Sequence, residues 1–127
     1  MKTEPIETVI GKLKGRNALY LDEVKQTFVP PSLIFRGNLS APQCSNYQGT
    51  ERFPAYEVIF EDYRYYDCTS LDNYKREKYL LSSFDLVVES DLINSLRLSA
   101  HYNHYVFATY DFVYEVVAKN FALNLKR

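Results

Sequence analysis

Both histidines of this chain lie in one segment whose residue types could support chemistry. His101 and His104 precede Asp111 and Glu115 in the stretch HYNHYVFATYDFVYEVVAKNF. Imidazole and carboxylate groups can ligate a metal ion, and they can also exchange protons as an acid–base pair. Either chemistry requires a fold that brings these side chains together, and the local sequence pattern predicts a different arrangement.

A strand over residues 101–109 would keep the two histidines apart. The aromatic and β-branched residues of this run favour a strand. Side chains three residues apart in a strand point to opposite faces, so one metal ion could not bind both imidazoles. We therefore expect His101 in the turn before the strand, and we predict no metal site around His104.

The two acidic residues that follow are better explained as parts of a helix. Apolar residues over 112–119 match one helical face, Asp111 would cap its first turn, and Lys119 suits its negative end. Glu115 is then expected as an exposed neighbour of Asp111 on the same side of the helix. Nothing near this pair supplies a nucleophile or an electrophile, so capping explains the pattern better than acid–base catalysis.

Other signs of catalysis are weak. The chain has no GxSxG or HExxH motif, and only four glycines are available for a phosphate-binding loop. Cys44 and Cys68 lack CxxC spacing and are expected to be reduced thiols. Cys68 is a weak candidate nucleophile, and a buried structural thiol is the preferred interpretation. We therefore predict a chain without enzymatic activity, cofactor or metal.

Composition predicts an ordinary globular chain with one domain over residues 1–127. Hydrophobic residues make up 46% of the sequence and charged residues 24%. A net charge of −1 argues against a nucleic-acid partner, which normally requires a basic face. No apolar run approaches the roughly 20 residues of a membrane-spanning helix. The N-terminus shows no apolar signal region, so a cytoplasmic location and no membrane partner are expected.

Tyrosine is unusually frequent, with 12 copies and no tryptophan, and half of the tyrosines lie within residues 56–79. Acidic residues also gather in this region, from Glu57 to Asp72. Tyrosines can simply line a sheet, but they also provide rigid contact area at protein interfaces. Carboxylates beside them would steer a basic partner. We predict that this region forms a partner-binding patch made of Tyr63, Tyr65, Tyr66, Asp62 and Asp67.

Periodicity predicts a sheet with a few helices. Apolar residues alternate with polar ones over residues 32–39, 56–61, 84–88 and 121–125. A change of phase at Glu61–Asp62 predicts a bulge or a tight hairpin there.

Two more helices are expected, one over residues 4–14 and one over residues 91–98, where Ser90 would cap the first turn. The predicted fold class is therefore α+β: a single domain with an antiparallel sheet of about five strands, packed with two or three short helices.

The C-terminal run resembles a class of small bacterial proteins. In this run an aromatic strand is followed by TYDFVYEVVAKNF and a last short strand. It is similar to uncharacterised proteins found beside polymorphic toxins, which are thought to act as immunity proteins. The resemblance covers residues 84–125 and contains no catalytic motif. It implies a cytoplasmic, non-enzymatic inhibitor that binds one partner protein, such as a toxin nuclease with a basic groove.

Two other functions remain open. One is a small ligand-binding or catalytic protein whose pocket contains His104, Asp111 and Cys68. The other is a structural homo-oligomer, for example a homodimer joined through the tyrosine-rich strand. A pocket that contains all three side chains would favour the first function. A mass that depends on protein concentration would favour the second.

Overall fold

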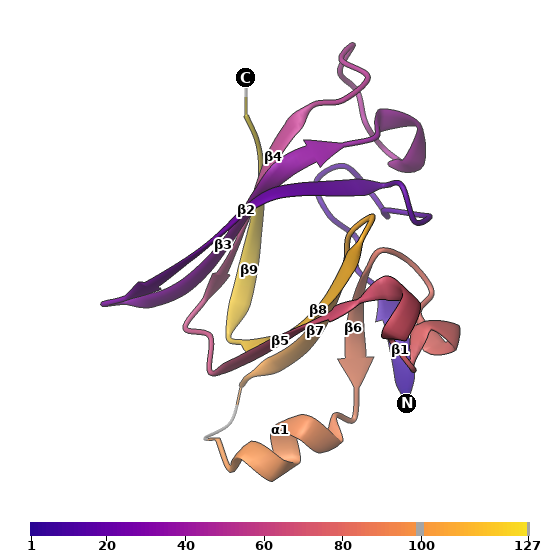
Figure 1. Ribbon diagram of the computed structural model, residues 1–127. Helices are drawn as coiled ribbons and strands as arrows, with labels where there is room; N and C mark the ends of the chain where they lie inside the picture. The colour runs from indigo at the N-terminus through magenta and orange to yellow at the C-terminus, as the bar shows by residue number, and fades with distance from the viewer. Residues whose placement is uncertain (99–100, 127) are drawn as a thin grey trace.

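The computed structural model describes residues 1–98 and 101–126, and its architecture is predominantly β. Within these residues, nine strands form two antiparallel sheets (Figure 1). The five-stranded sheet has the order β1 (Lys2–Pro5), β6 (Phe84–Val88), β7 (Asn103–Ala108), β8 (Phe112–Ala118), β5 (Tyr65–Ser70). The four-stranded sheet has the order β2 (Leu19–Phe28), β3 (Pro31–Leu39), β4 (Ala55–Glu61), β9 (Asn120–Lys126).

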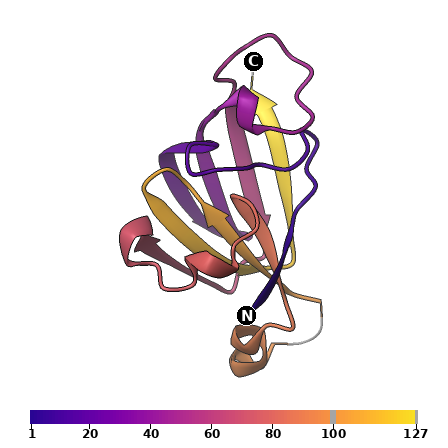
Figure 2. The ribbon, with the colours of Figure 1, turned by 90° about the vertical axis from the view of Figure 1, so that its right-hand side faces the viewer.

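Helical structure is sparse. The described part of the chain contains one α-helix, α1 (Asp91–Leu96), together with short 3₁₀ turns at Ala41–Gln43, Leu71–Asn73 and Glu77–Tyr79. Figures 1 and 2 show α1 beyond the end of the five-stranded sheet, away from the four-stranded one. The predicted α+β fold, one sheet with two or three helices, is therefore wrong. No helix among the described residues has the length and apolar character needed to cross a membrane.

The two sheets meet at a corner where two neighbouring segments bend together. Strand β8 continues into β9 through Lys119, and β4 continues into β5 through residues 62–64. Hydrogen bonds cross the bend, since Lys119 N donates to Glu61 O at 3.0 Å and Arg64 N donates to Val117 O at 2.8 Å. β4 pairs with β9, and β5 pairs with β8. The phase change at Glu61–Asp62 therefore marks a change of sheet, and the bulge or hairpin predicted there is not formed.

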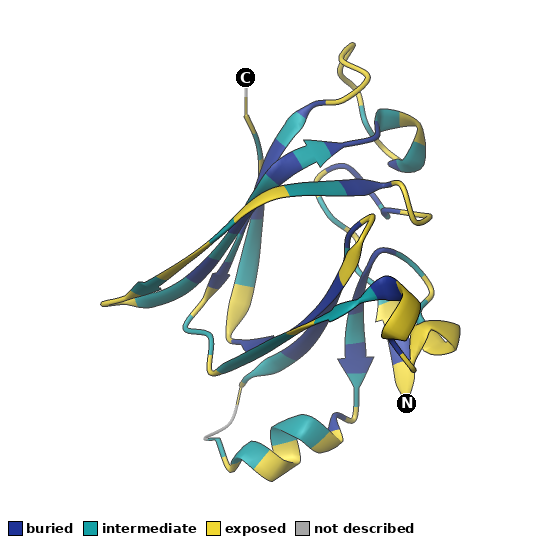
Figure 3. Ribbon diagram, viewed as in Figure 1, coloured by how far each residue is buried: buried dark blue, intermediate teal, exposed yellow. Residues whose placement is uncertain are grey.

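Aromatic side chains fill the space between the inner faces of the sheets. Phe35 and Phe60 come from the four-stranded sheet, and Phe84 and Phe107 come from the five-stranded sheet; all four are fully buried. The ring centroids of Phe35 and Phe107 lie 5.1 Å apart, and those of Phe60 and Phe84 lie 6.0 Å apart. Such ring pairs contribute about 0.5–1.5 kcal/mol each beyond the burial of their area. Figure 3 shows the buried segments along the strands of both sheets.

The strands predicted from alternation are confirmed. The predicted segments 32–39, 56–61, 84–88 and 121–125 match β3, β4, β6 and β9. The strand expected around His104 is β7, and His101 precedes it with a positive φ of 84°. The helix after Ser90 is also present as α1, and the Ser90 hydroxyl accepts a hydrogen bond from Ile93 N at 3.1 Å.

The helix predicted over residues 112–119 is wrong, because this segment is strand β8. The pairing register places Tyr114 and Val116 opposite inward-facing residues of β7, so they face the core. Val113 and Glu115 face the other side of the sheet and are also buried. A strand buried on both faces shows no alternation, so its apolar spacing can match a helical stripe.

The helix predicted over residues 4–14 is also wrong. Its first part pairs with β6 as β1, and the remainder is irregular. Gly11 has a φ of 82°, and a Cβ there would lie 2.8 Å from Asn46 N. The backbone of residues 45–46 occupies the space that a helical side chain would need. Ile10 and Leu13 are buried in the core without forming the face of a helix.

Candidate functional site: a buried polar cluster and an exposed hairpin tip

A covering segment, residues 71–82, lies over the outer face of the five-stranded sheet. Polar side chains of the sheet hold it in place. Asp85 is fully buried, and its carboxylate accepts hydrogen bonds from Leu81 N at 2.6 Å and from the Ser82 hydroxyl. The Thr3 hydroxyl donates to Tyr79 O at 2.5 Å. These contacts bury the polar residues on this side of β6, β7 and β8.

Ser90, His104 and Glu115 form a continuous chain of hydrogen bonds on this face. Ser90 lies at the junction of β6 and α1, His104 on β7 and Glu115 on β8. His104 Nδ1 is 2.7 Å from Ser90 Oγ, and His104 Nε2 is 2.7 Å from Glu115 Oε1. The three residues are 8%, 2% and 5% exposed. We call these residues, together with Arg76, the polar cluster.

Arg76 links the covering segment to this cluster. Its Nη1 atom lies 3.2 Å from Glu115 Oε1, while half of the arginine side chain remains in solvent. Burial alone would raise the pKa of Glu115. The hydrogen bond from His104 and the positive charge of Arg76 outweigh that effect and hold the pKa below its usual value. Glu115 is therefore an ionised carboxylate inside the fold.

The ionised state of Glu115 determines the direction of the other hydrogen bonds. A carboxylate only accepts, so His104 Nε2 carries the proton that it donates to Glu115. In the neutral ring, Nδ1 then accepts from the Ser90 hydroxyl. The Ser90 oxygen in turn accepts from Ile93 N. Both ring nitrogens are satisfied, and the imidazole is held from two sides.

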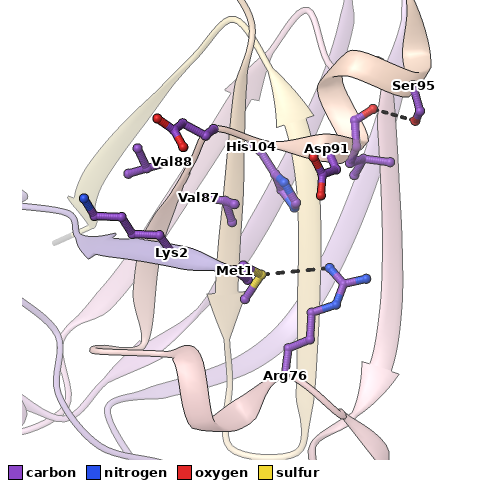
Figure 4. A pocket seen from close by; sticks show the side chains of 10 residues that line it. Met1, Lys2, Arg76, Val87, Val88, Asp91, Ser95 and His104 are labelled. Carbon is purple, nitrogen blue, oxygen red and sulfur yellow. Dashed lines mark hydrogen bonds between the residues drawn. The ribbon is translucent and has the colours of Figure 1, made fainter.

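Two surface cavities border His104. The larger has a volume of about 830 Å³ and brings together charges of both signs from Lys2, Arg76, Glu89 and Asp91. Figure 4 shows His104 at this pocket beside Val87, with Arg76 opposite. The smaller has a volume of about 390 Å³, and Ser90 belongs to its lining. Among the described residues, no group of three or more His, Cys, Asp and Glu side chains is arranged to hold a metal ion.

The structure divides the predicted tyrosine patch between different surroundings. Tyr63 and Tyr66 pack against the hydrophobic core, with ring centroids 6.1 Å apart. Tyr65 and Asp67 lie on the opposite face of β5, where the Tyr65 hydroxyl donates to Asp67 Oδ2 at 2.7 Å. Asp62 lies at the corner between the sheets. The five residues do not form one continuous surface.

Nearby basic groups also pair with some of the acids of this region. Asp62 Oδ1 is 2.9 Å from Arg64 Nη2, and Lys119 Nζ lies 3.7 Å from Asp62 Oδ2. A hydrogen bond from the Tyr102 hydroxyl, followed by these two charges, lowers the pKa of Asp62. Glu57 is paired in the same way with Arg36 at 2.7 Å. The negative charge expected to steer a basic partner is therefore partly compensated, at Asp62 and Glu57.

The alternative pocket predicted from His104, Asp111 and Cys68 is not formed. Asp111 is exposed in the turn between β7 and β8, where no helix begins. Cys68 lies on β5 opposite Tyr114, on the face of the sheet away from His104. It is exposed, so the preferred interpretation of a buried thiol is wrong. Glu115, predicted to be exposed beside Asp111, is instead the buried partner of His104.

A second region stands out at the end of the β2–β3 hairpin. The hairpin tip, residues 28–31, consists of four consecutive apolar residues. Phe28 is 75% exposed and Val29 is 96% exposed. The Val29–Pro30 peptide bond is cis, and the Thr27 hydroxyl donates to Pro30 O at 2.8 Å. Figure 3 shows this end of the hairpin at the left of the molecule, projecting away from the core.

The sequence pattern predicts neither the hairpin tip nor the complete polar cluster. No motif marks residues 28–31, and their place at a hairpin end follows from the pairing of β2 with β3. Ser90 was identified as a helix cap, but its contact with His104 spans 14 residues and cannot be read from local spacing.

Comparisons with protein-family models, with curated proteins and with solved structures find no match to this chain.

Proposed function

We propose that this protein is a protein-binding module whose docking element is the hairpin tip. The observation that carries the proposal is the exposure of Phe28 and Val29 at a position where the fold does not use them. Burying such a pair against a partner would remove a large apolar area from water. Exposed apolar groups clustered on one protruding turn are typical of an interaction site.

The tip is already held in its shape before binding. The Thr27 hydroxyl donates a hydrogen bond to Pro30 O. Asp62 N donates to Pro31 O at 2.9 Å, and this bond connects the start of β3 to the corner between the sheets. Two successive prolines further limit the backbone. A partner would therefore not have to order this turn, and the entropy cost of binding is reduced.

The surroundings of the tip favour a partner with an apolar pocket. Several charges on the four-stranded sheet are paired with each other, as in Arg36, which contacts Glu23 at 3.3 Å and Glu57 at 2.7 Å. They offer little net field to attract a highly charged surface. A toxin inhibitor, as the sequence resemblance implies, is one member of this class. The contact would then lie in an apolar cleft of the toxin and not in its basic groove.

The experiment that tests this proposal is site-specific photocrosslinking in cells of the organism that encodes the chain. A photoreactive phenylalanine analogue replaces Phe28, and in a matched control it replaces Phe53, an exposed residue outside the tip. We expect one protein to be crosslinked from position 28 and not from position 53. A second variant, Val29→Ser in the position-28 background, should reduce the yield of that crosslink.

Other outcomes would contradict the proposal. Equal products from positions 28 and 53 would show that the tip has no special role. Crosslinks to lipid alone would make it a membrane anchor, and crosslinks to the chain itself would make it a self-association site. Each of these results excludes a separate protein partner at the tip.

A further inference from the structure

We propose that Ser90 is an activated nucleophile that reacts with small carboxylic esters. This inference rests on the polar cluster and is independent of the hairpin tip. A serine hydroxyl, an imidazole and a carboxylate linked in this order are the parts that activate a serine for acyl transfer. Such a set is recognised by its geometry and not by its order in the chain. The contact of Ser90 with His104 and the contact of His104 with Glu115 both have this geometry.

The first requirement is a base in hydrogen-bond contact with the nucleophile. Ser90 Oγ and His104 Nδ1 are separated by 2.7 Å, within the range for direct proton transfer. The second is an orienting carboxylate, and Glu115 Oε1 lies 2.7 Å from His104 Nε2. Arg76 acts as a positioning residue, because it contacts the same carboxylate oxygen from the covering segment.

The third requirement is space for a substrate beside the hydroxyl. Ser90 borders the cavity of about 390 Å³, which lies between the end of β6, α1 and the start of β7. Leu86 and Ile93 give it an apolar wall, and Glu4 and Glu89 bring carboxylates to its lining. The volume limits the substrate to a small molecule, and the carboxylates disfavour anions. A small neutral or cationic ester is therefore the class that fits.

The reaction begins when Ser90 Oγ attacks the carbonyl carbon of the ester and its proton passes to His104 Nδ1. Glu115 stabilises the imidazolium that results. The bond between the acyl carbon and the leaving oxygen then breaks, and His104 returns the proton to the departing alcohol. Water releases the acyl group in a second step, in which His104 Nδ1 takes a proton from the water and passes it to Ser90 Oγ.

Covalent labelling of the intact protein tests this proposal. A fluorophosphonate reacts with activated serines, since the oxygen–phosphorus bond forms as fluoride leaves. We expect one adduct per folded chain, mapped to Ser90 by peptide mass spectrometry, and turnover of p-nitrophenyl acetate that the adduct abolishes. Unfolding in urea before labelling should remove the reaction at Ser90.

Three variants separate activation from a structural role. Ser90→Asn keeps a good helix cap while removing the hydroxyl, and it should show no adduct. Ser95→Ala removes an exposed serine of the same helix and should label as the wild type does. Glu115→Gln keeps a hydrogen-bond acceptor for His104 but removes the charge, and it should slow labelling by about 100-fold. Circular dichroism confirms that each variant is folded.

Two results would overturn the proposal. One is the absence of a Ser90 adduct in folded wild-type protein at probe concentrations that label a serine hydrolase completely. The other is labelling of Ser90 at the same rate in wild type and in Glu115→Gln, because the cluster would then not activate the hydroxyl. In either case the hydrogen bonds of Ser90 and His104 serve the fold alone.

Discussion

The hairpin tip and the polar cluster place opposite kinds of side chain in opposite environments. At the tip, Phe28 and Val29 extend into water, and the contacts that hold the turn involve Thr27 and backbone carbonyl groups. In the cluster, His104 and Glu115 are withdrawn from water and bind each other directly. An apolar tip and a polar interior each depart from the usual distribution of residues.

The difference shows which region the fold depends on. The cluster must be complete to be stable, because a buried polar group without its partner carries a large desolvation cost. The tip contributes little to folding, since its two most exposed side chains make few contacts that unfolding would break. Residues that the fold does not need are the ones best explained by an external partner.

The largest effect is expected from Glu115→Ala. It removes the acceptor of His104 Nε2–H and the partner of Arg76, and it leaves the imidazole buried without that contact. The free energy of unfolding should fall by about 3 kcal/mol. Urea denaturation followed by circular dichroism measures this change. A loss below about 0.5 kcal/mol, the range of ordinary surface substitutions, would show that the cluster is not structural.

The next effect concerns acid stability. The pKa of Glu115 is lower in the folded state than its ordinary value of 4.5, so the folded chain binds this proton more weakly than the unfolded chain. The stabilisation is present above pH 4.5 and is lost as the pH falls through the folded pKa. Glu115→Gln cannot titrate, so its free energy of unfolding should fall less steeply below pH 4.5. Parallel curves for the two proteins in urea titrations would contradict this assignment.

A smaller effect is expected from Thr27→Val, which removes the hydrogen bond to Pro30 O while keeping the shape of the side chain. Stability should fall by about 1 kcal/mol or less, because the bond is exposed. Partner binding should weaken more clearly than this loss suggests, since the turn is no longer held in one shape. Thermal melts measure the loss of stability, and binding titrations measure the loss of affinity for the partner. Unchanged affinity would mean that partner binding does not depend on the fixed shape of the turn.

The smallest effect on stability is expected from the double change Phe28→Ser and Val29→Ser. The free energy of unfolding should change by no more than about 0.5 kcal/mol, because both side chains are exposed in the folded and unfolded chain. Chemical denaturation beside the wild type provides the test. A decrease of several kcal/mol in the free energy of unfolding would show that Phe28 and Val29 stabilise the fold, as the polar cluster does.

The sheets could be predicted from the sequence wherever one face is polar and the other apolar. Strand β3 alternates because Leu33 and Phe35 face the core while Ile34 and Arg36 are only partly buried. Strand β8 could not be predicted in this way. Its outer face is covered by residues 71–82, so Val113 and Glu115 are as buried as Tyr114. The sequence does not show in advance that a distant segment covers a strand.

The candidate site was harder to predict from the sequence for the same reason. His104 and Glu115 were recognised as residues that could do chemistry, but the predicted helix placed Glu115 in solvent. Their contact depends on the pairing of β7 with β8, which joins residues 11 positions apart. The residues of the predicted tyrosine patch are divided for the complementary reason. Alternation along β5 sends Tyr65 and Tyr66 to opposite faces, so neighbours in the sequence are separated in space.

We propose that partner binding resides in the hairpin tip. The most direct test is the dissociation constant of the crosslinked partner for three proteins: the wild type, Phe28→Ser with Val29→Ser, and Val9→Ser with Phe53→Ser as a control for exposed apolar residues elsewhere. We expect affinity to fall by about 30-fold or more for the tip variant, as for an interface hot spot. The control should bind as the wild type does. Equal affinities for all three proteins would show that the partner does not bind at the hairpin tip.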